Sequence, residues 1–241
     1  MKTPVGLQLY SVRDSMKEDF EGTLEKVSAL GYTAVEFAGF FDRTPEQVNG
    51  LLKKYGLSLW GTHCGLQDLL ADYQATVDYH KAIGNRYYII PAHDLKTQEK
   101  LDRFIDQVNP LCRSLAREGI TLAYHNHDWE FEKTGDGSTV FDQLVARTDL
   151  KFEVDTYWAF IGMQDPIGLM EQLKDRLIFA HIKDGTLAKE DKPLGMGETP
   201  VAQIVDYARE KGVPMIVESE SCNPSGLAEA QICIRYLKPL L

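Results

Sequence analysis

Four segments in the second half of the chain place histidine and carboxylate residues at matched positions. Each segment alternates apolar and polar residues and ends in two polar side chains of the same parity: His125 and His127, Glu153 and Asp155, His181 and Lys183, and Glu218 and Glu220. Taking one residue from each pair gives two imidazoles, of His125 and His181, and two carboxylates, of Asp155 and Glu218. This donor set suits Mn²⁺, Zn²⁺, Fe²⁺ or Co²⁺ better than Ca²⁺. The spacing therefore predicts one divalent metal ion, of undecided identity, held by those four residues.

The alternation of apolar and polar residues indicates which way these side chains point. Successive side chains of a strand face opposite sides, so Leu122 and Tyr124 share one face while Ala123 and His125 share the other. An apolar face must pack on outer helices, which turns the polar face toward the interior of a barrel. Buried ionisable groups cost several kcal/mol per charge unless they are compensated. A divalent cation compensates them directly, and the alternative is that the groups form salt bridges with one another.

Eight apolar segments are expected to form strands, and they alternate with amphipathic helical patterns. The expected strands are residues 5–10, 34–37, 57–61, 87–90, 121–125, 152–155, 178–182 and 215–218, and the clearest helical patterns are 19–30, 44–55 and 97–118. Eight strand-plus-helix units predict an α/β fold, a (β/α)₈ TIM barrel in which residues 1–241 form a single domain. The alternative, an open doubly wound sheet, would carry a glycine-rich phosphate turn after its first strand, and residues 9–15 (LYSVRDS) contain no glycine.

Composition narrows the classes of partner and compartment. The chain has 241 residues and a formal net charge of −10, which argues against a nucleic-acid backbone as the main ligand. Its cysteines form no C-x-x-C pair and are expected to be reduced thiols of a cytoplasmic protein. The sequence shows neither a signal peptide nor the ~18 consecutive apolar residues of a spanning helix. We therefore expect a small-molecule partner and neither nucleic acid nor membrane, and the sequence leaves the oligomeric state open.

Six motifs carry a resemblance to a known family: GLQLYSVRD, GYTAVEFAG, YHNHDWEF, FEVDTYWAF, HIKDG and VESE. With these motifs in this order, the chain resembles the xylose-isomerase-like TIM-barrel superfamily over essentially its whole length. The subgroup it resembles is the sugar phosphate isomerase/epimerase proteins of the YHNHDFEF type, which are related to inosose dehydratases and tagatose epimerases. The resemblance implies one metal ligand on each of strands five to eight, and the matching positions here are His125, Asp155, His181 and Glu218.

Two positions depart from the pattern of that superfamily. Its epimerases typically have glutamate where this chain has His125, and that glutamate is also an acid–base group. A second acid–base group beside Glu218 must then come from elsewhere, and His127 and Lys183 are the nearest candidates by strand parity. Trp158 stands where related enzymes often have the histidine with which the endonucleases hold further zinc ions. This difference and the negative charge argue against a DNA-repair activity.

Four other residues are candidates for substrate binding. Glu36 ends the second expected strand with inward parity, His63 and His93 follow the third and fourth strands, and Trp158 is placed to stack on a sugar ring. Each has a structural alternative, namely pairing with a neighbouring cation for Glu36, a loop histidine with satisfied hydrogen bonds for His63 and His93, and ordinary packing for Trp158.

Several neighbouring residues have simpler expected roles. Lys183 either stabilises an oxyanion or donates a proton, or it is the buried partner of Glu153. His80, inside a helical pattern, is expected to be structural, and Asp184 is expected to orient Lys183 or a loop. Residues 189–200, with two glycines, form either a phosphate site or a mobile lid. Limited proteolysis is expected to cut first in residues 133–138 or 189–197.

The expected activity is that of a metal-dependent isomerase or epimerase of sugars or keto sugars, acting through an enediolate, with Glu218, His127 and Lys183 as catalytic candidates. The same enediolate leads to elimination when a β-substituent leaves. A dehydratase or lyase acting on a 3-keto sugar or keto-polyol is therefore the alternative. A non-catalytic sugar-binding barrel is the distant alternative.

Overall fold

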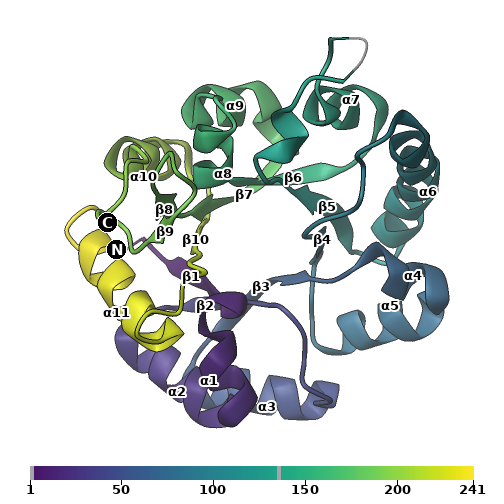
Figure 1. The fold of residues 1–241 in the computed structure, drawn as a ribbon. Coiled ribbons are helices and arrows are strands. Elements are labelled where there is room, and N and C mark those ends of the chain that lie inside the picture. The colour runs from purple at the N-terminus through teal and green to yellow at the C-terminus, as the bar shows by residue number, and fades with distance from the viewer. Residues whose placement is uncertain (1–2, 135–136) are drawn as a thin grey trace.

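The computed structural model describes residues 3–134 and 137–241. Parallel strands close into a barrel around which the helices form a ring, as Figure 1 shows. The barrel strands are β1 (Val5–Gln8), β2 (Ala34–Phe37), β3 (Ser58–His63), β4 (Tyr87–Ile90), β5 (Thr121–His125), β6 (Lys151–Asp155), β7 (Leu177–Ile182) and β10 (Met215–Val217). Their order around the barrel is β1-β10-β7-β6-β5-β4-β3-β2. The predicted (β/α)₈ TIM barrel is confirmed.

Closure of the barrel depends on the first strand, which pairs with both the last barrel strand and the second. Val5 lies opposite Met215 of β10, and Gly6 lies opposite Ala34 of β2. The chain ends meet at the same place, because Thr3 Oγ1 donates to the carbonyl of Leu241 over 3.4 Å.

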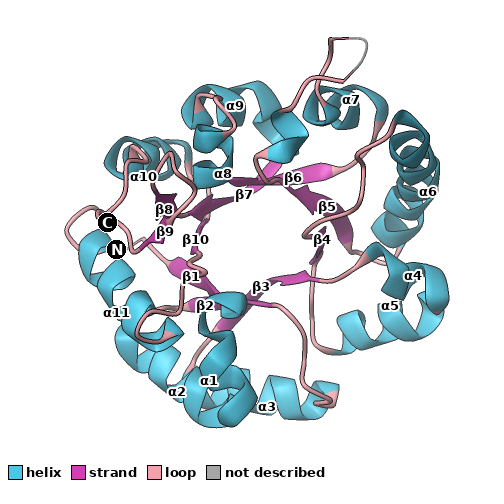
Figure 2. Ribbon diagram, viewed as in Figure 1, coloured by secondary structure: helices cyan, strands magenta, loops and turns pink. Residues whose placement is uncertain are grey.

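Helices alternate with the strands, as the colouring of Figure 2 makes plain. They are α1 (Arg13–Glu18), α2 (Phe20–Leu30), α3 (Pro45–Tyr55), α4 (Leu66–Ala71), α5 (Tyr73–Ala82), α6 (Gln98–Arg117), α7 (Val140–Arg147), α8 (Thr156–Ile161), α9 (Pro166–Leu173), α10 (Val201–Lys211) and α11 (Gly226–Leu237). Short 3₁₀ turns are η1 (Leu9–Val12), η2 (Trp129–Phe131) and η3 (Lys174–Arg176). Within the described residues, no helix combines the length and the apolar character that a membrane span requires.

Local sequence signals explain where the helices begin and end. Thr44 and Gln47 form a capping box before α3, and Pro45 occupies its first turn, where the missing N–H costs no hydrogen bond. Helix α2 ends at Gly31, which has a φ of 107°. Glycine adopts such a positive φ with little steric strain, because it has no Cβ atom. Thr97 caps α6 by accepting from the backbone of Lys100.

The ends of three strands differ from expectation. The first strand stops at Gln8, because its side-chain oxygen accepts the backbone N–H of Tyr10 and starts the turn η1. The third strand runs to His63, since Thr62 and His63 pair with β4. The last barrel strand ends at Val217, so Glu218 follows it directly.

The interior of the barrel is filled in two layers. Toward the amino ends of the strands lies an apolar cluster of Ile89, Ala123, Phe179 and Ile216, with Trp60 stacked on Phe179 at a centroid distance of 6.0 Å. Two residues further along the same strands, toward their carboxyl ends, come His125, His181 and Glu218. The apolar layer closes one end of the barrel, and the polar residues face the other end.

Candidate metal centre

Four strand ends bring the predicted metal ligands together. His125 ends β5, Asp155 ends β6, His181 lies on β7 and Glu218 follows β10. One ligand atom from each lies within 4.8 Å of the ligand atoms of the other three. The exposed fractions of these four residues are 2%, 0%, 0% and 5%. A cluster of buried ionisable groups at this density needs a compensating partner.

Asp155 provides the test of whether a cation fits. Its Oδ1 accepts the backbone N–H of Trp158 over 2.8 Å and so caps α8, which fixes the carboxyl group in place. Its Oδ2 is buried and has no hydrogen-bond partner among the described residues. Burial raises the pKa of Asp155 to about 8, with the nearby Glu218 charge acting in the same direction. A buried carboxylate oxygen without a partner, beside two imidazoles and a second carboxylate, is the arrangement that a divalent cation satisfies. The residues fit the predicted metal ion.

A second group of ionisable residues lies beneath this one and shares two of its members. His63, His125, Glu153 and His181 also have ligand atoms within 4.8 Å of one another. His63 Nε2 lies 2.6 Å from Glu153 Oε2, and His125 Nδ1 lies 3.2 Å from the same oxygen. Sequence reasoning gave Glu153 only a possible pairing with Lys183. Its inward parity on β6 was the signal that it belongs to this cluster.

The two inner carboxyl groups have opposite electrostatic environments. Burial and the neighbouring Glu153 charge raise the pKa of Glu36 to about 7. Burial also disfavours the charged form of Glu153, but the charges of His181 and His63 outweigh it and hold the pKa well below its usual range. Glu153 is therefore the ionised member of the pair.

Lys183 is not the partner of Glu153 that one alternative predicted. Its ammonium group pairs with Glu220, lies 3.6 Å from Asp191 Oδ1 and sits 4.3 Å from the ring centroid of Trp158. The reason is that β7 ends at Ile182, so Lys183 leaves the strand direction and turns toward the hairpin that follows. Burial acts to lower the pKa of Lys183, but the negative charges of Glu218 and Asp155 outweigh it. The pKa is therefore raised above its usual value, and Lys183 stays charged.

His127 lies beyond the end of β5 and still faces the cluster. Its backbone N–H donates to Glu130 over 2.8 Å, which fixes the turn after the strand. Its ring centroid lies 5.2 Å from that of His125 and 5.4 Å from that of Trp158. Burial lowers the pKa of His127, and its Nδ1 has no hydrogen-bond partner among the described residues. His127 is thus a neutral imidazole with an unused nitrogen.

A cavity of about 420 Å³ opens above the metal cluster. It is lined by Tyr10, Ala38, His63, Pro91, Ala92, His125, His127, Glu218 and Glu220. Of the four predicted substrate residues, only His63 lines it. Glu36 is completely buried, Trp158 lies under Lys183, and His93 packs on Phe104 with ring centroids 4.9 Å apart.

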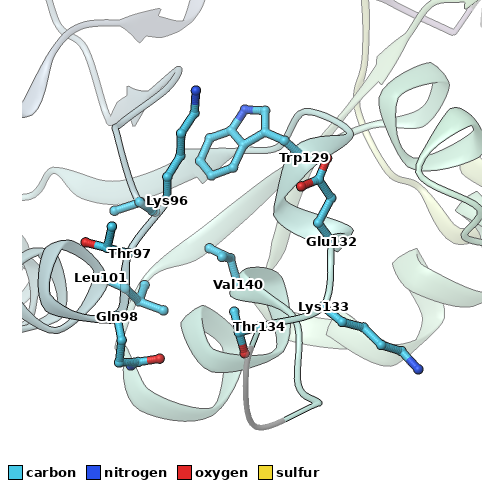
Figure 3. A pocket seen from close by; sticks show the side chains of 10 residues that line it. Lys96, Thr97, Gln98, Leu101, Trp129, Glu132, Lys133, Thr134 and Val140 are labelled. Carbon is cyan, nitrogen blue, oxygen red and sulfur yellow. The ribbon is translucent and has the colours of Figure 1, made fainter.

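A larger cavity of about 650 Å³ lies outside this site, between the start of α6 and the segment around η2 (Figure 3). Leu101 and Val140 form an apolar wall, and Trp129 and Lys96 stand at its mouth. None of the candidate metal ligands lines it.

The loop after β7 is held in place by one buried carboxylate. Asp184 accepts the backbone N–H groups of Gly195 and Gly197 through Oδ2, and that of Thr199 through Oδ1. The loop also contains a two-stranded hairpin of β8 (Asp184–Gly185) and β9 (Asp191–Lys192). The prediction that Asp184 orients a loop is confirmed, since these bonds tie residues 195–199 of the segment for which a phosphate site or a mobile lid was expected.

His80 is structural, as expected. It is 3% exposed, and its Nδ1 lies 3.0 Å from the side-chain amide of Asn85. Burial lowers its pKa to about 4.

Comparison with known proteins agrees with the barrel fold. The family model described as "Xylose isomerase-like TIM barrel" matches residues 24–239. A curated inosose dehydratase of Geobacillus kaustophilus is 24% identical over 189 residues, which are 67% of this chain and 60% of that protein. A solved sugar phosphate isomerase/epimerase from Parabacteroides distasonis superposes with a TM-score of 0.83 at 24% identity and covers 98% of both chains. The structure of D-psicose 3-epimerase from Clostridium cellulolyticum H10 superposes with a TM-score of 0.74 at 16% sequence identity, and the match covers 99% of both chains. The chain thus spans less than two thirds of that curated relative, and both solved structures share its fold.

Proposed function

The chain belongs to the xylose isomerase-like TIM barrel family, and from that premise we propose that it is a divalent-metal-dependent isomerase or epimerase of sugars or keto sugars. One observation carries the proposal: two imidazoles and two carboxylates converge within 4.8 Å, and two of these residues, His125 and Glu218, line an open cavity. The cavity lies at the carboxyl ends of the strands, where TIM barrels place their active sites. Its volume of about 420 Å³ is in the range of small-molecule sites.

His125, Asp155, His181 and Glu218 would hold the metal ion. When bound, a divalent ion polarises a substrate carbonyl and makes the neighbouring C–H group more acidic. The remaining chemistry is proton transfer by side chains that line the cavity.

Glu218 is the proposed general base. It lines the cavity, and its Oε2 lies 3.0 Å from Nδ1 of His181. Burial acts to raise its pKa, but His181 and Lys183 outweigh this effect and keep the pKa well below its usual range. A carboxylate that stays ionised at the edge of a cavity can accept a proton from a substrate carbon.

His127 is the proposed second proton carrier. It lines the same cavity, is neutral, and has an Nδ1 without a hydrogen-bond partner in the part of the chain that the structure describes. An unpartnered ring nitrogen exchanges a proton with substrate, which a metal-bound imidazole of His125 does not do. Lys183 does not line the cavity, and we assign its charge to stabilising the carboxylates of Asp155 and Glu218.

Dehydration is the second candidate function, and the curated relatives favour it. Both are named inosose dehydratase, and the second, from Lactiplantibacillus plantarum, is 25% identical over 202 residues. Elimination begins with the same loss of a proton next to a carbonyl to Glu218, and the leaving hydroxyl needs a proton, which the newly protonated Glu218 can give back.

The test is proton NMR of candidate substrates in D₂O with protein loaded with Mn²⁺, Co²⁺ or Zn²⁺. Ketoses, keto sugars and inososes form the panel, with chelated protein and Asp155→Ala as controls. Deuterium incorporation with a new isomer or epimer supports the first function, and an unsaturated product supports dehydration. Binding of these compounds without exchange at any carbon would refute both and favour a non-catalytic sugar-binding barrel.

A further inference from the structure

His181 carries a carboxylate at each of its two ring nitrogens. Its Nδ1 lies 3.0 Å from Glu218 Oε2, on the side of the candidate metal ligands. Its Nε2 lies 2.9 Å from Glu36 Oε2 and 3.1 Å from Glu153 Oε1. A neutral imidazole has one N–H donor and one lone pair, so the partner that takes the proton decides which nitrogen can bind a metal.

Glu36 is built into this position by its surroundings. The backbone N–H of Tyr10 donates to Gln8 Oε1, so the amide of Gln8 must point its NH₂ group at Glu36. Gln8 Nε2 then donates to Glu36 Oε2 over 2.7 Å, beside the bond from His181. This oxygen is therefore an acceptor, and the proton between Glu36 and His181 belongs to Nε2.

A missing side chain on β3 makes room for the carboxyl group. A Cβ added at Gly61 would lie 2.6 Å from Glu36 Oε1 and 2.7 Å from the Cδ1 of Ile89. Real Cβ atoms essentially never make contacts this short, so a side chain at residue 61 would force the carboxyl group of Glu36 and the end of the Ile89 side chain to shift.

We propose that Glu36 is a positioning residue of the metal centre, which holds the Nε2 proton of His181 and leaves Nδ1 free to bind the ion. Glu36 is completely buried and does not line the cavity, so we assign it this role rather than the contact with a substrate hydroxyl expected from the sequence. Glu153 is placed to do the same for His125, whose Nδ1 lies 3.2 Å from Glu153 Oε2. This inference rests on the metal centre of the proposed function.

Outer carboxylates that orient histidine ligands typically change metal affinity by about 10- to 100-fold. We expect Glu36→Ala to weaken Zn²⁺ binding by that factor in a chelator-competition titration. Gly61→Ala should act in the same direction, because it displaces the carboxyl group without removing it. Glu36→Gln, which keeps an acceptor oxygen, should lose less affinity than Glu36→Ala.

The matched control is Glu229→Gln, which changes another fully buried glutamate. Glu229 accepts the backbone N–H of Cys222 over 2.8 Å and belongs to helix α11. Its variant should bind Zn²⁺ as the wild type does. Long-range ¹H–¹⁵N spectra of the Zn²⁺-loaded protein give a readout that simple destabilisation does not move. They should show the His181 proton on Nε2 in the wild type and a changed Nε2–H resonance in Glu36→Ala.

Wild-type Zn²⁺ affinity in both Glu36→Ala and Gly61→Ala would overturn the inference. So would a second equivalent of Zn²⁺ that disappears with Glu36, since Glu36 would then be a ligand. Neither measurement uses turnover. A protein that shows the Glu36 effect but no sugar chemistry would therefore refute the proposed function alone.

Discussion

Replacing Asp184 by asparagine should release the loop that follows β7. The side chain is 1% exposed and accepts four backbone N–H groups over 2.9–3.1 Å, those of Gly185, Gly195, Gly197 and Thr199. Asparagine has the same shape but carries an NH₂ group in place of one oxygen. Two of the four N–H groups then face a donor and lose their acceptor.

The size of the effect follows from those two hydrogen bonds. Each buried donor without an acceptor costs about 1–3 kcal/mol, so the loss of two should lower the free energy of unfolding by about 2–6 kcal/mol. The matched control is Asp165→Asn, because Asp165 caps α9 by accepting one exposed N–H, from Ile167 over 3.1 Å. Asparagine caps helices almost as well as aspartate, so this variant should lose less than about 1 kcal/mol.

Urea unfolding followed by circular dichroism measures the loss, and trypsin digestion reports local opening. Trypsin can cut after Lys189, whereas Lys192 is followed by Pro193 and is protected from it. Cleavage after Lys189 should be faster in Asp184→Asn than in the wild type or in Asp165→Asn. Equal stability of the two variants, with unchanged cleavage, would refute the idea that Asp184 holds this loop.

Three other changes have defined outcomes. Glu218→Gln should retain much of the bound metal and lose at least ~100-fold in turnover, and wild-type deuterium exchange into substrate would show that the base lies elsewhere. His127→Asn should reduce turnover less and should slow one of the two proton-transfer steps, which isotope effects measured in the two reaction directions would detect. The pKa of His80 is about 4 in the folded protein, against 6.5 in the unfolded chain. The unfolded chain alone therefore takes up a proton as the pH falls from about 6.5 to about 4, and the free energy of unfolding should drop by about 3 kcal/mol over this range. Urea melts of His80→Gln should lack this component, and an unchanged pH dependence would contradict it.

Strand periodicity predicted most of the fold and the four residues that converge at the strand ends. The reason is that the period of two decides which face of a strand each side chain occupies, whatever its neighbours are. Helices α2 and α3 were predicted to within a residue because Asp19, Gly31 and the capping box of Thr44 mark their ends chemically.

Contacts across the barrel interior could not be predicted from the sequence. Glu36 and His181 lie 145 residues apart, and their contact depends on how far each strand is staggered around the barrel. The alternative that paired Lys183 with Glu153 was wrong for a related reason. Strand β7 ends at Ile182, so the alternation of side chains no longer predicts where Lys183 points. The hairpin that brings Asp191 to Lys183 carries no strong periodic pattern in the sequence.

Elemental analysis of protein purified without chelator tests the central claim most directly. The wild type should contain Mn, Zn, Fe or Co at close to one equivalent per chain. Asp155→Ala and His181→Ala should each lose the metal, while Glu229→Gln should keep it. A wild-type protein that binds none of these metals on reconstitution would contradict the account, as would full occupancy in both ligand variants.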